Sequence, residues 1–223
     1  MAVKSERRYK KMKELKPYRN KLILTCFLTC LPLFIGLLLW DRLPEQMATH
    51  FGADNVANGW SSKPFTVIGM PLLLTALHLF TILITLNDPK KKNIGGKIFS
   101  FIFWIIPAVS LICCLSTYAY ALGLPVNIGL IVNLMLGIVF IVLGNYMSKN
   151  HQNYTIGIRL PWTLDSSENW NRTHRLASVL WVLAGIAILA NSFFQSTAVL
   201  FLVIIAASVI PAVYSFILHT KGI

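Results

Sequence analysis

The chain has 223 residues, of which 56% are hydrophobic and only 13% charged. This composition is far more apolar than that of an average soluble protein, so it indicates a membrane protein and argues against a soluble enzyme. The formal net charge of +12 is also typical of nucleic-acid-binding proteins, but nine of the 20 Lys and Arg residues fall within residues 1–21. A basic segment beside an apolar run is typical of contact with anionic membrane lipid, so we expect no direct binding to nucleic acid.

Residues 1–21 are predicted to form a basic cytoplasmic tail, and an apolar run follows directly. That run is longer than the apolar region of a signal peptide and ends in Trp-Asp-Arg-Leu-Pro rather than at small residues, so we interpret it as a retained span. Five further runs are long enough, as helices, to cross a hydrocarbon core of about 30 Å. The six predicted spans, none of which contains Asp, Glu, Lys or Arg, cover residues 22–40, 65–86, 98–120, 125–147, 176–194 and 198–218.

The distribution of basic residues predicts the orientation of these spans. If the N-terminus is cytoplasmic, 18 of the 20 Lys and Arg residues lie in cytoplasmic segments, and only Arg42 and Lys63 lie outside. Such a bias is what the positive-inside rule describes. We therefore predict an all-α integral membrane protein with six transmembrane helices and both termini in the cytoplasm.

The connections between spans predict the domain organisation. A two-span N-terminal domain is expected over residues 22–97, with an outer loop at 41–63. A four-span domain is expected over residues 98–223, with an inner loop at 148–175. These two loops are the longest and most varied polar segments between the spans, so they are the regions in which we expect the functional residues.

Cysteine positions and motif searches predict neither a cofactor nor an enzyme. All four cysteines lie within apolar runs, so no disulfide framework is expected. Cys26 and Cys30 are four residues apart on one helix face, which permits metal binding, but we interpret both as small apolar side chains. Because the sequence shows no zinc signature, phosphate-binding loop or nucleophile with its base, we expect no metal, no cofactor and no catalytic residue.

The outer loop, DRLPEQMATHFGADNVANGWSSK, combines acidic residues with a histidine and aromatic residues. Its Gly, Asn and Pro content predicts an irregular folded loop. Glu45 and His50 could ligate a metal, but their spacing matches no standard site, and we favour a structured cap with Trp60 at the lipid interface. An outward recognition surface is compatible with this cap, and its candidate residues are Asp41, Glu45, His50 and Trp60.

The inner loop includes NYTIGIRLPWTLDSSENWNRTHR. Asp165 and Glu168 have the spacing of a helix N-cap and its partner, so a helix is predicted to begin near Ser166. The tryptophans and arginines suit an interfacial layer in which guanidinium groups reach lipid phosphates. The alternative is that Arg159, Trp162 and Trp170 form a docking platform for a cytoplasmic partner.

Polar residues inside the spans leave a transport function open. His78 and Asn133 lie within spans, and Pro71 and Pro107 are expected to kink the second and third spans. A small transporter or channel could use these features. The spans contain no carboxylate, however, and proton pathways normally have one.

Both long loops resemble the SdpI family of bacterial membrane proteins, and the resemblance covers about residues 22–218. The inner loop is similar to the family signature, a GxRxPWTL core followed by a Trp and an Asn/His-Arg pair. The outer loop is similar to an amino-terminal membrane domain often fused to it, through Leu43, Pro44, Glu45, Thr49, His50, Gly59, Trp60 and Lys63. The matching inner residues are Gly157, Arg159, Pro161, Trp162, Thr163, Leu164, Trp170, His174 and Arg175.

The resemblance implies a function in the bacterial plasma membrane. It implies immunity of the producing cell to a secreted antimicrobial peptide toxin, which would be the extracellular partner. It also implies a relay in which the toxin-bound protein holds a cytoplasmic transcriptional repressor at the membrane. Anionic membrane lipid is expected as a further partner of the basic residues.

Overall fold

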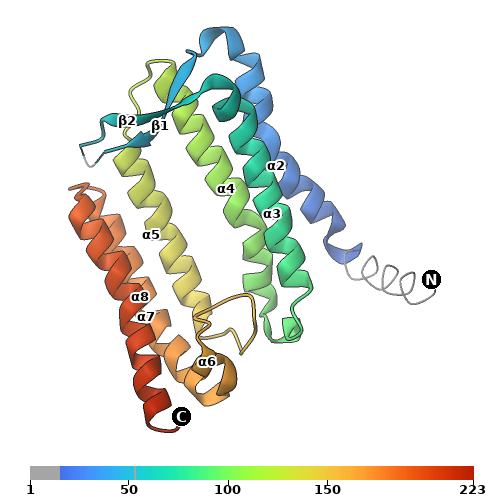
Figure 1. The fold of residues 1–223 in the computed structure, drawn as a ribbon, viewed down its shortest axis with the longest axis vertical. Coiled ribbons are helices and arrows are strands. Elements are labelled where there is room, and N and C mark those ends of the chain that lie inside the picture. The colour runs from blue at the N-terminus through green and yellow to red at the C-terminus, as the bar shows by residue number, and fades with distance from the viewer. Residues whose placement is uncertain (1–15, 53) are drawn as a thin grey trace. The chain divides into compact units, whose positions relative to one another are not determined.

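The computed structural model describes residues 16–52 and 54–223. Residues 1–15, which make up most of the predicted basic tail, lie outside the described residues. Within the described residues the chain forms long helices, several short helical turns and one two-stranded sheet (Figure 1). The long helices are α2 (Arg19–Leu38), α3 (Met70–Leu86), α4 (Gly96–Ala121), α5 (Ile128–Met147), α7 (Ser167–Asn191) and α8 (Thr197–Thr220).

The six predicted spans are confirmed, because six helical segments are long and apolar enough to cross a membrane. The second span includes the π-helical turn η3 (Phe65–Gly69), which leads directly into α3. The spans also carry large exposed apolar side chains, and Leu38 and Leu202 are 88% and 70% exposed. Such faces need hydrocarbon as their solvent, so the protein is a multi-pass cell membrane protein.

Short elements connect the spans. The outer loop contains the turn η2 (Trp40–Arg42) and the strands β1 (Gln46–Phe51) and β2 (Ala57–Ser62). The remaining short elements are η1 (Lys16–Tyr18), η4 (Lys91–Asn93) and α6 (Pro161–Asp165).

The prediction of an irregular outer loop is wrong, because β1 and β2 pair as a hairpin. The backbone N–H of Lys63 donates to the carbonyl of Glu45 at the base, and that of Gly52 donates to Val56 near the tip. Asn55 takes a positive φ of 62° in the turn, a conformation that Asn adopts more readily than most residues. Of the Gly and Asn residues that suggested irregularity, Gly52 and Asn55 therefore lie at the turn of a regular hairpin, and Asn58 and Gly59 lie in β2.

The chain divides into two compact units, which are described separately. Unit 1 takes in the described residues up to Met47, together with Ser61–Asn87 and Ser100–Leu124. Unit 2 takes in Ala48–Trp60, Asp88–Phe99 and Pro125–Ile223. The domain boundary predicted at residues 97 and 98 rests on sequence alone and stays a prediction.

Unit 1 packs α2 and α3 together and buries a small apolar cluster. Its fully or nearly fully buried members are Leu43, Met47, Val67, Cys114 and Tyr118. Polar side chains also connect its helices. The hydroxyl of Ser110 donates to the carbonyl of Thr29 over 2.8 Å, because a polar group in a span needs a partner within the protein.

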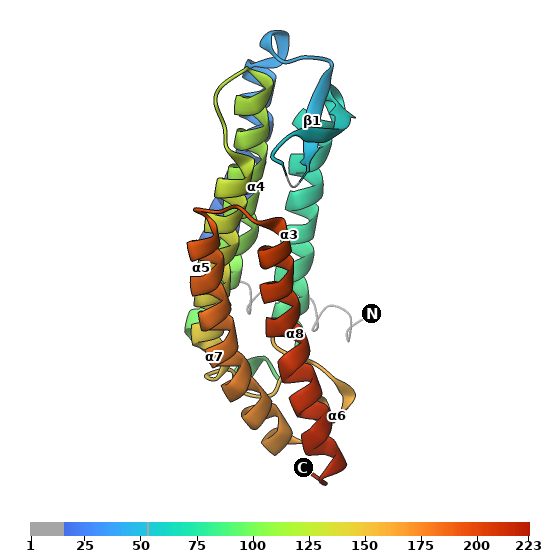
Figure 2. The ribbon, with the colours of Figure 1, turned by 90° about the vertical axis from the view of Figure 1, so that its left-hand side faces the viewer.

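Unit 2 is organised around α7, which packs against both α5 and α8 (Figure 2). The contact between α5 and α7 depends on small residues. A side chain added at Gly137 or Gly185 would lie within about 3 Å of the facing backbone, since each glycine approaches the carbonyl oxygen of the other. Close approach at small residues is a common way for helices to associate in membranes.

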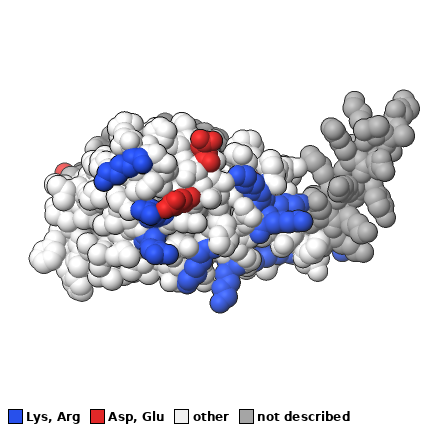
Figure 3. Space-filling model, turned by 90° about the horizontal axis from the view of Figure 1, so that it is seen from below, with Lys and Arg blue, Asp and Glu red and all other residues white. Residues whose placement is uncertain are grey.

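The hairpin tip lies at one end of the helices of unit 2, and the 148–160 segment lies at the other end. Asn55 at the hairpin tip bonds to Asn127 before α5 and to Gln195 before α8. At the opposite end, Asn93 bonds to Gln152 in the 148–160 segment. This arrangement agrees with the predicted alternation of outer and inner segments. The assignment of the second end to the cytoplasm stays a prediction from charge. Figure 3 shows the molecule from below the view of Figure 1, and more Lys and Arg than Asp and Glu are visible there.

Candidate functional site

The base of the hairpin is held by a buried lysine. Lys63 is only 6% exposed, and its Nζ lies 2.8 Å from a carboxylate oxygen of Glu45. The same Nζ donates to the carbonyl of Trp40 over 3.3 Å and lies 5.2 Å from the centre of the Trp40 ring. Because Lys63 neutralises Glu45, this carboxylate is half of an ion pair rather than an isolated acidic group.

The other candidate residues of the outer loop are exposed. The ring of His50 contacts Asn58 on the opposite strand, with 2.6 Å between Nδ1 and Oδ1. Trp60 is 58% exposed, and Asp41 is also exposed. Asp54 accepts a hydrogen bond from the backbone N–H of Val56 and so closes the turn. The hairpin therefore presents side chains outward, as a recognition surface requires.

In the inner loop, the proline motif begins the short helix α6. Leu160 has an extended backbone, with ψ of 156°, as expected before a proline. Pro161 is the first residue of α6, where its missing N–H costs nothing. The hydroxyl of Thr163, fully buried, accepts from the N–H of Leu160 and donates to the carbonyl of Ile158, both over 2.8 Å.

Behind this turn, Gly157, Trp170 and His174 form a buried cluster. The rings of Trp170 and His174 stack with centroids 3.9 Å apart, and Trp170 donates from Nε1 to the carbonyl of Asn150 over 2.8 Å. Gly157 has a φ of 119°, and a Cβ at this position would clash with Nε2 of His174 and would lie only 3.0 Å from the Trp170 ring. Only glycine provides both this backbone conformation and this space.

The hydrogen bonds of His174 define its protonation state. The N–H of Ile158 donates to Nε2 over 3.0 Å, so Nε2 is an acceptor and carries no proton. The proton therefore lies on Nδ1, which donates to the carbonyl of Trp170 over 2.8 Å. His174 is thus a neutral side chain that connects the inner loop to the first turns of α7.

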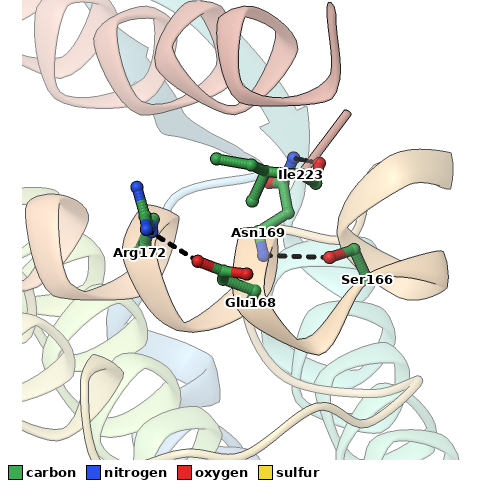
Figure 4. A network of polar contacts seen from close by, with 5 residues as sticks. All are labelled: Ser166, Glu168, Asn169, Arg172 and Ile223. Carbon is green, nitrogen blue, oxygen red and sulfur yellow. Dashed lines mark hydrogen bonds and ion pairs between the residues drawn. The ribbon is translucent and has the colours of Figure 1, made fainter. Parts of the chain in front are cut away.

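The start of α7 is confirmed at the predicted position, but the predicted cap is wrong. Ser166 caps the helix and accepts from the N–H of Asn169, while Glu168 pairs with Arg172 over 2.6 Å (Figure 4). The displacement by one residue arises because Asp165 is the last residue of α6. Asn169 in turn donates to the carbonyls of Ser215 and Ile223, which connects the start of α7 to the end of α8.

Trp162 joins α6 to α8. Its Nε1 donates to the hydroxyl of Ser215 over 2.5 Å, and its ring stacks on His219 with 5.6 Å between centroids. Phe216 contacts the same ring edge-on. Trp162 is only partly buried. It therefore contacts α8 and is still partly accessible at the surface.

The docking platform suggested by the sequence requires a correction. Trp170 is fully buried and His174 is 1% exposed, so neither contacts a partner or a lipid at the surface. Arg159, Pro161 and Arg175 are exposed, and Arg159 donates to the carbonyl of Tyr154 over 2.8 Å. Burial of the stacked rings therefore divides the motif into an internal framework and an exposed basic surface.

Several residues that hold this framework were not predicted. Asp88 is 5% exposed and accepts from the backbone N–H groups of Lys90 and Tyr154 and from the hydroxyl of Thr155. Asn153 is fully buried and accepts from two backbone N–H groups that follow it. In the sequence, these residues stand in Asn-rich and Asp-containing stretches that follow the second and fourth spans. Such stretches are equally typical of solvated turns, so they did not indicate buried residues.

The polar span residues considered for transport lie in different units. His78 in unit 1 is fully buried, and its Nε2 lies 2.9 Å from the hydroxyl of Thr25. Asn133 in unit 2 donates to the carbonyl of Gly129 and accepts from Asn191. Among the described residues, no group of three or more His, Cys, Asp or Glu side chains is placed to hold a metal ion.

Comparisons with known proteins identify both regions. Residues 149–215 match the model of the SdpI/YfhL protein family, and residues 27–75 match a family described as a domain of unknown function, DUF1648. The chain is similar to the immunity protein SdpI of Bacillus subtilis (strain 168), with 31% identity over 83% of this chain and 88% of the relative. No solved structure matches the chain. The identity extends over most of both sequences, so the chain belongs to the SdpI family of membrane proteins.

Proposed function

We propose that this protein is a membrane immunity protein that protects the cell producing it from a secreted antimicrobial peptide. The observation that carries the proposal is the 31% identity over 83% of the chain with an immunity protein. The function we propose is binding and not catalysis. In the described parts, many polar side chains hold loops or connect helices, which is compatible with a binding function.

We place toxin capture at the outer surface. In the outer segment, Asp41 and Glu45 of unit 1 and Asp54 of unit 2 carry acidic groups, and His50 and Trp60 of unit 2 are exposed on the hairpin. An acidic surface attracts a cationic peptide before it reaches the membrane and raises its rate of association. Because exposed charges are screened by salt, this contribution weakens as ionic strength rises.

We assign a second role to the exposed basic residues of the inner motif. Arg159 and Arg175 are exposed, and the buried cluster of Gly157, Trp170 and His174 supports the segment between them. At the cytoplasmic surface these arginines would bind anionic lipid headgroups. We further propose that a toxin-bound form of this surface holds a cytoplasmic repressor and thereby relays the presence of toxin.

The protective function is tested by survival. The chain is expressed in a bacterium sensitive to a secreted antimicrobial peptide toxin, and survival is measured with membrane levels checked by immunoblot. Protection at normal membrane levels supports the proposal, and its absence at those levels rejects it. An unrelated six-span protein expressed to the same level is the control.

The division of roles is tested by two pairs of variants. Glu45→Gln and His50→Ala are expected to weaken binding of labelled toxin, with a loss that shrinks as salt is added. Arg159→Ala and Trp162→Ala are expected to leave toxin binding intact but to reduce survival or the relay. Loss of outer binding by a folded Arg159→Ala variant would contradict this division.

Orientation needs its own test, because the two faces are assigned from charge. Tags before Lys4 and after Lys221 should be protected in intact cells, whereas a tag near Asn55 should be accessible. Accessibility of either terminal tag would exchange the positions of the two proposed surfaces.

A further inference from the structure

Unit 2 contains a cavity of about 160 Å³ at the end that carries the hairpin tip. Its lining comes from three places in the sequence: Phe51 and Asn55 of the hairpin, Val132 and Asn133 of α5, and Gln195 and Leu200 at the start of α8. If the orientation predicted from charge is correct, this end faces the outside. The cavity would then lie where a secreted peptide first meets the protein.

The polar side of the cavity is a connected set of neutral amide groups. Asn55 donates to Oε1 of Gln195 over 2.7 Å and accepts from the backbone N–H of Gly129 over 2.6 Å. Asn133, which is 3% exposed, donates to the carbonyl of Gly129 and accepts from Asn191 over 2.9 Å. Because each amide is held by its neighbours, the wall is preorganised and need not be ordered when a ligand binds.

The apolar side of the cavity consists of Phe51, Ile128, Val132 and Leu200. The lining within the described residues contains no Asp, Glu, Lys or Arg. A charged ligand group would lose its hydration there without gaining an ion pair, which is costly. An uncharged peptide segment instead satisfies both sides, because its side chain meets apolar atoms and its backbone meets amides.

The volume limits the ligand to about one side chain. An apolar protein cavity of about 150 Å³ holds a benzene molecule, so a cavity of similar size holds one phenyl ring or one branched aliphatic side chain. We propose that this cavity binds a single apolar or aromatic side chain of the toxin, with the adjoining peptide groups hydrogen-bonded to Asn55 and Gln195. This inference rests on the proposed immunity function and identifies the uncharged part of the peptide that the protein recognises.

The cavity and the acidic outer residues contribute to different steps of binding. The acidic residues act at a distance and accelerate the encounter with a cationic peptide. The cavity acts only after contact and slows dissociation, because the bound side chain must return to water. We therefore expect that the contribution of the cavity to toxin affinity persists when salt is added, whereas the contribution of the acidic residues decreases.

The test fills the cavity and compares each filling variant with a neighbour on the same helix. Val132→Trp and Leu200→Trp occupy the cavity, whereas Leu134→Trp and Leu202→Trp add the same ring at exposed positions, 40% and 70% exposed. Each protein is placed in lipid nanodiscs. Binding of N-acetyl-phenylalanine amide is measured by saturation-transfer NMR, with N-acetyl-glutamate as the charged comparison.

We expect the wild-type protein and both exposed-site variants to bind N-acetyl-phenylalanine amide and not N-acetyl-glutamate. Both filling variants should lose this binding at least tenfold, and cells that express them should lose protection at 0.3 M salt as well as at low salt. If a filling variant does not reach the membrane, Val132→Phe provides a smaller filling substitution with the same expectation.

Two outcomes separate this inference from the proposed function. If the wild-type protein protects and a folded filling variant binds the amide and protects equally well, the cavity is not the toxin site. If the wild-type protein does not protect, the immunity proposal fails, and amide binding alone decides whether the cavity accepts an uncharged aromatic group. Tight binding of N-acetyl-glutamate to the wild-type protein would overturn the ligand class.

Discussion

The hairpin of residues 46–62 and the inner segment of residues 148–175 are both polar connections between spans, yet they keep their shapes in different ways. The hairpin is held by backbone pairing between β1 and β2, and exposed side chains alternate with partly buried ones along β2, while Met47 and Ala48 of β1 are buried. The inner segment has little regular structure before α6, and its shape depends on buried side chains such as Thr163, Trp170 and His174.

This difference predicts how each region tolerates substitution. The exposed side chains of the hairpin can change without loss of fold, because the backbone bonds remain and only Met47 and Ala48 of its two strands are buried. In the inner segment, buried polar side chains such as Thr163 and His174 bond to backbone N–H groups of the loop, so a single change leaves such a group unsatisfied. The hairpin is therefore suited to a binding surface whose side chains can change, and the inner segment is suited to a conformation that stays the same.

Two tryptophans provide the sharpest test of this comparison. Trp170→Ala removes a fully buried ring and its bond to Asn150, and should destabilise the protein by about 3–5 kcal/mol. Trp60→Ala removes a ring that is 58% exposed and should change stability by about 0.5 kcal/mol or less. Denaturation in detergent followed by circular dichroism measures both, and equal losses would refute the comparison.

Gly157→Ala tests the tightest point of the inner segment. The substitution forces a φ of 119° on a residue with a Cβ and places that atom against Trp170 and His174, so we expect a loss on the order of 2–4 kcal/mol. Gly96→Ala is the matched control, because a Cβ at Gly96 would meet no atom within 4 Å. Membrane level and thermal midpoint should fall only for the Gly157 variant.

His174→Phe separates hydrogen bonding from ring stacking. Phenylalanine can still stack on Trp170 but cannot accept from the N–H of Ile158, so the cost should be about 1–3 kcal/mol. The control is His219→Phe, which changes an exposed ring that stacks on Trp162. A hydrogen-exchange measurement should show faster exchange of the Ile158 amide only in the His174 variant. Unchanged exchange there would mean that the bond does not hold the loop.

Glu45→Gln should also have only a small effect on folding. The Glu45 carboxylate is 84% exposed, and surface ion pairs contribute about 1 kcal/mol or less. Lys63 also keeps its contacts with the carbonyl and ring of Trp40. The thermal midpoint should therefore stay close to that of the wild type, while the rate of toxin association falls at low salt. A large drop in stability would show that Glu45 serves the fold rather than recognition.

The spans could be predicted closely because hydrophobic length is a local property of the sequence. The predicted span over residues 65–86 matches the observed Phe65–Leu86, and that over 98–120 lies within Gly96–Ala121. The largest difference is at α7, which begins at Ser167 instead of 176. Its first turns are polar because they pack against the inner segment, so a hydrophobic pattern alone could not include them.

The candidate residues were predicted less completely than the spans. Chemistry and family resemblance indicated Gly157, Trp170 and His174, but not that they form one buried cluster. Both interpretations of the inner loop placed its arginines at a surface, and Arg159 and Arg175 are exposed. Asp88, Asn150 and Asn153 were missed, because their partners lie in segments or turns whose conformation no sequence pattern predicts.

The sequence by itself determined the number of spans, the presence of two polar connections and the family resemblance, since each depends on residue types over short stretches. Only the tertiary structure decided which aromatic and polar residues are buried, and that Asn55, Asn133 and Gln195 line one cavity. The physical reason is that burial and hydrogen-bond partners depend on contacts between residues far apart in the chain. Asn55 and Gln195, 140 positions apart, meet at 2.7 Å only after the helices of unit 2 have packed.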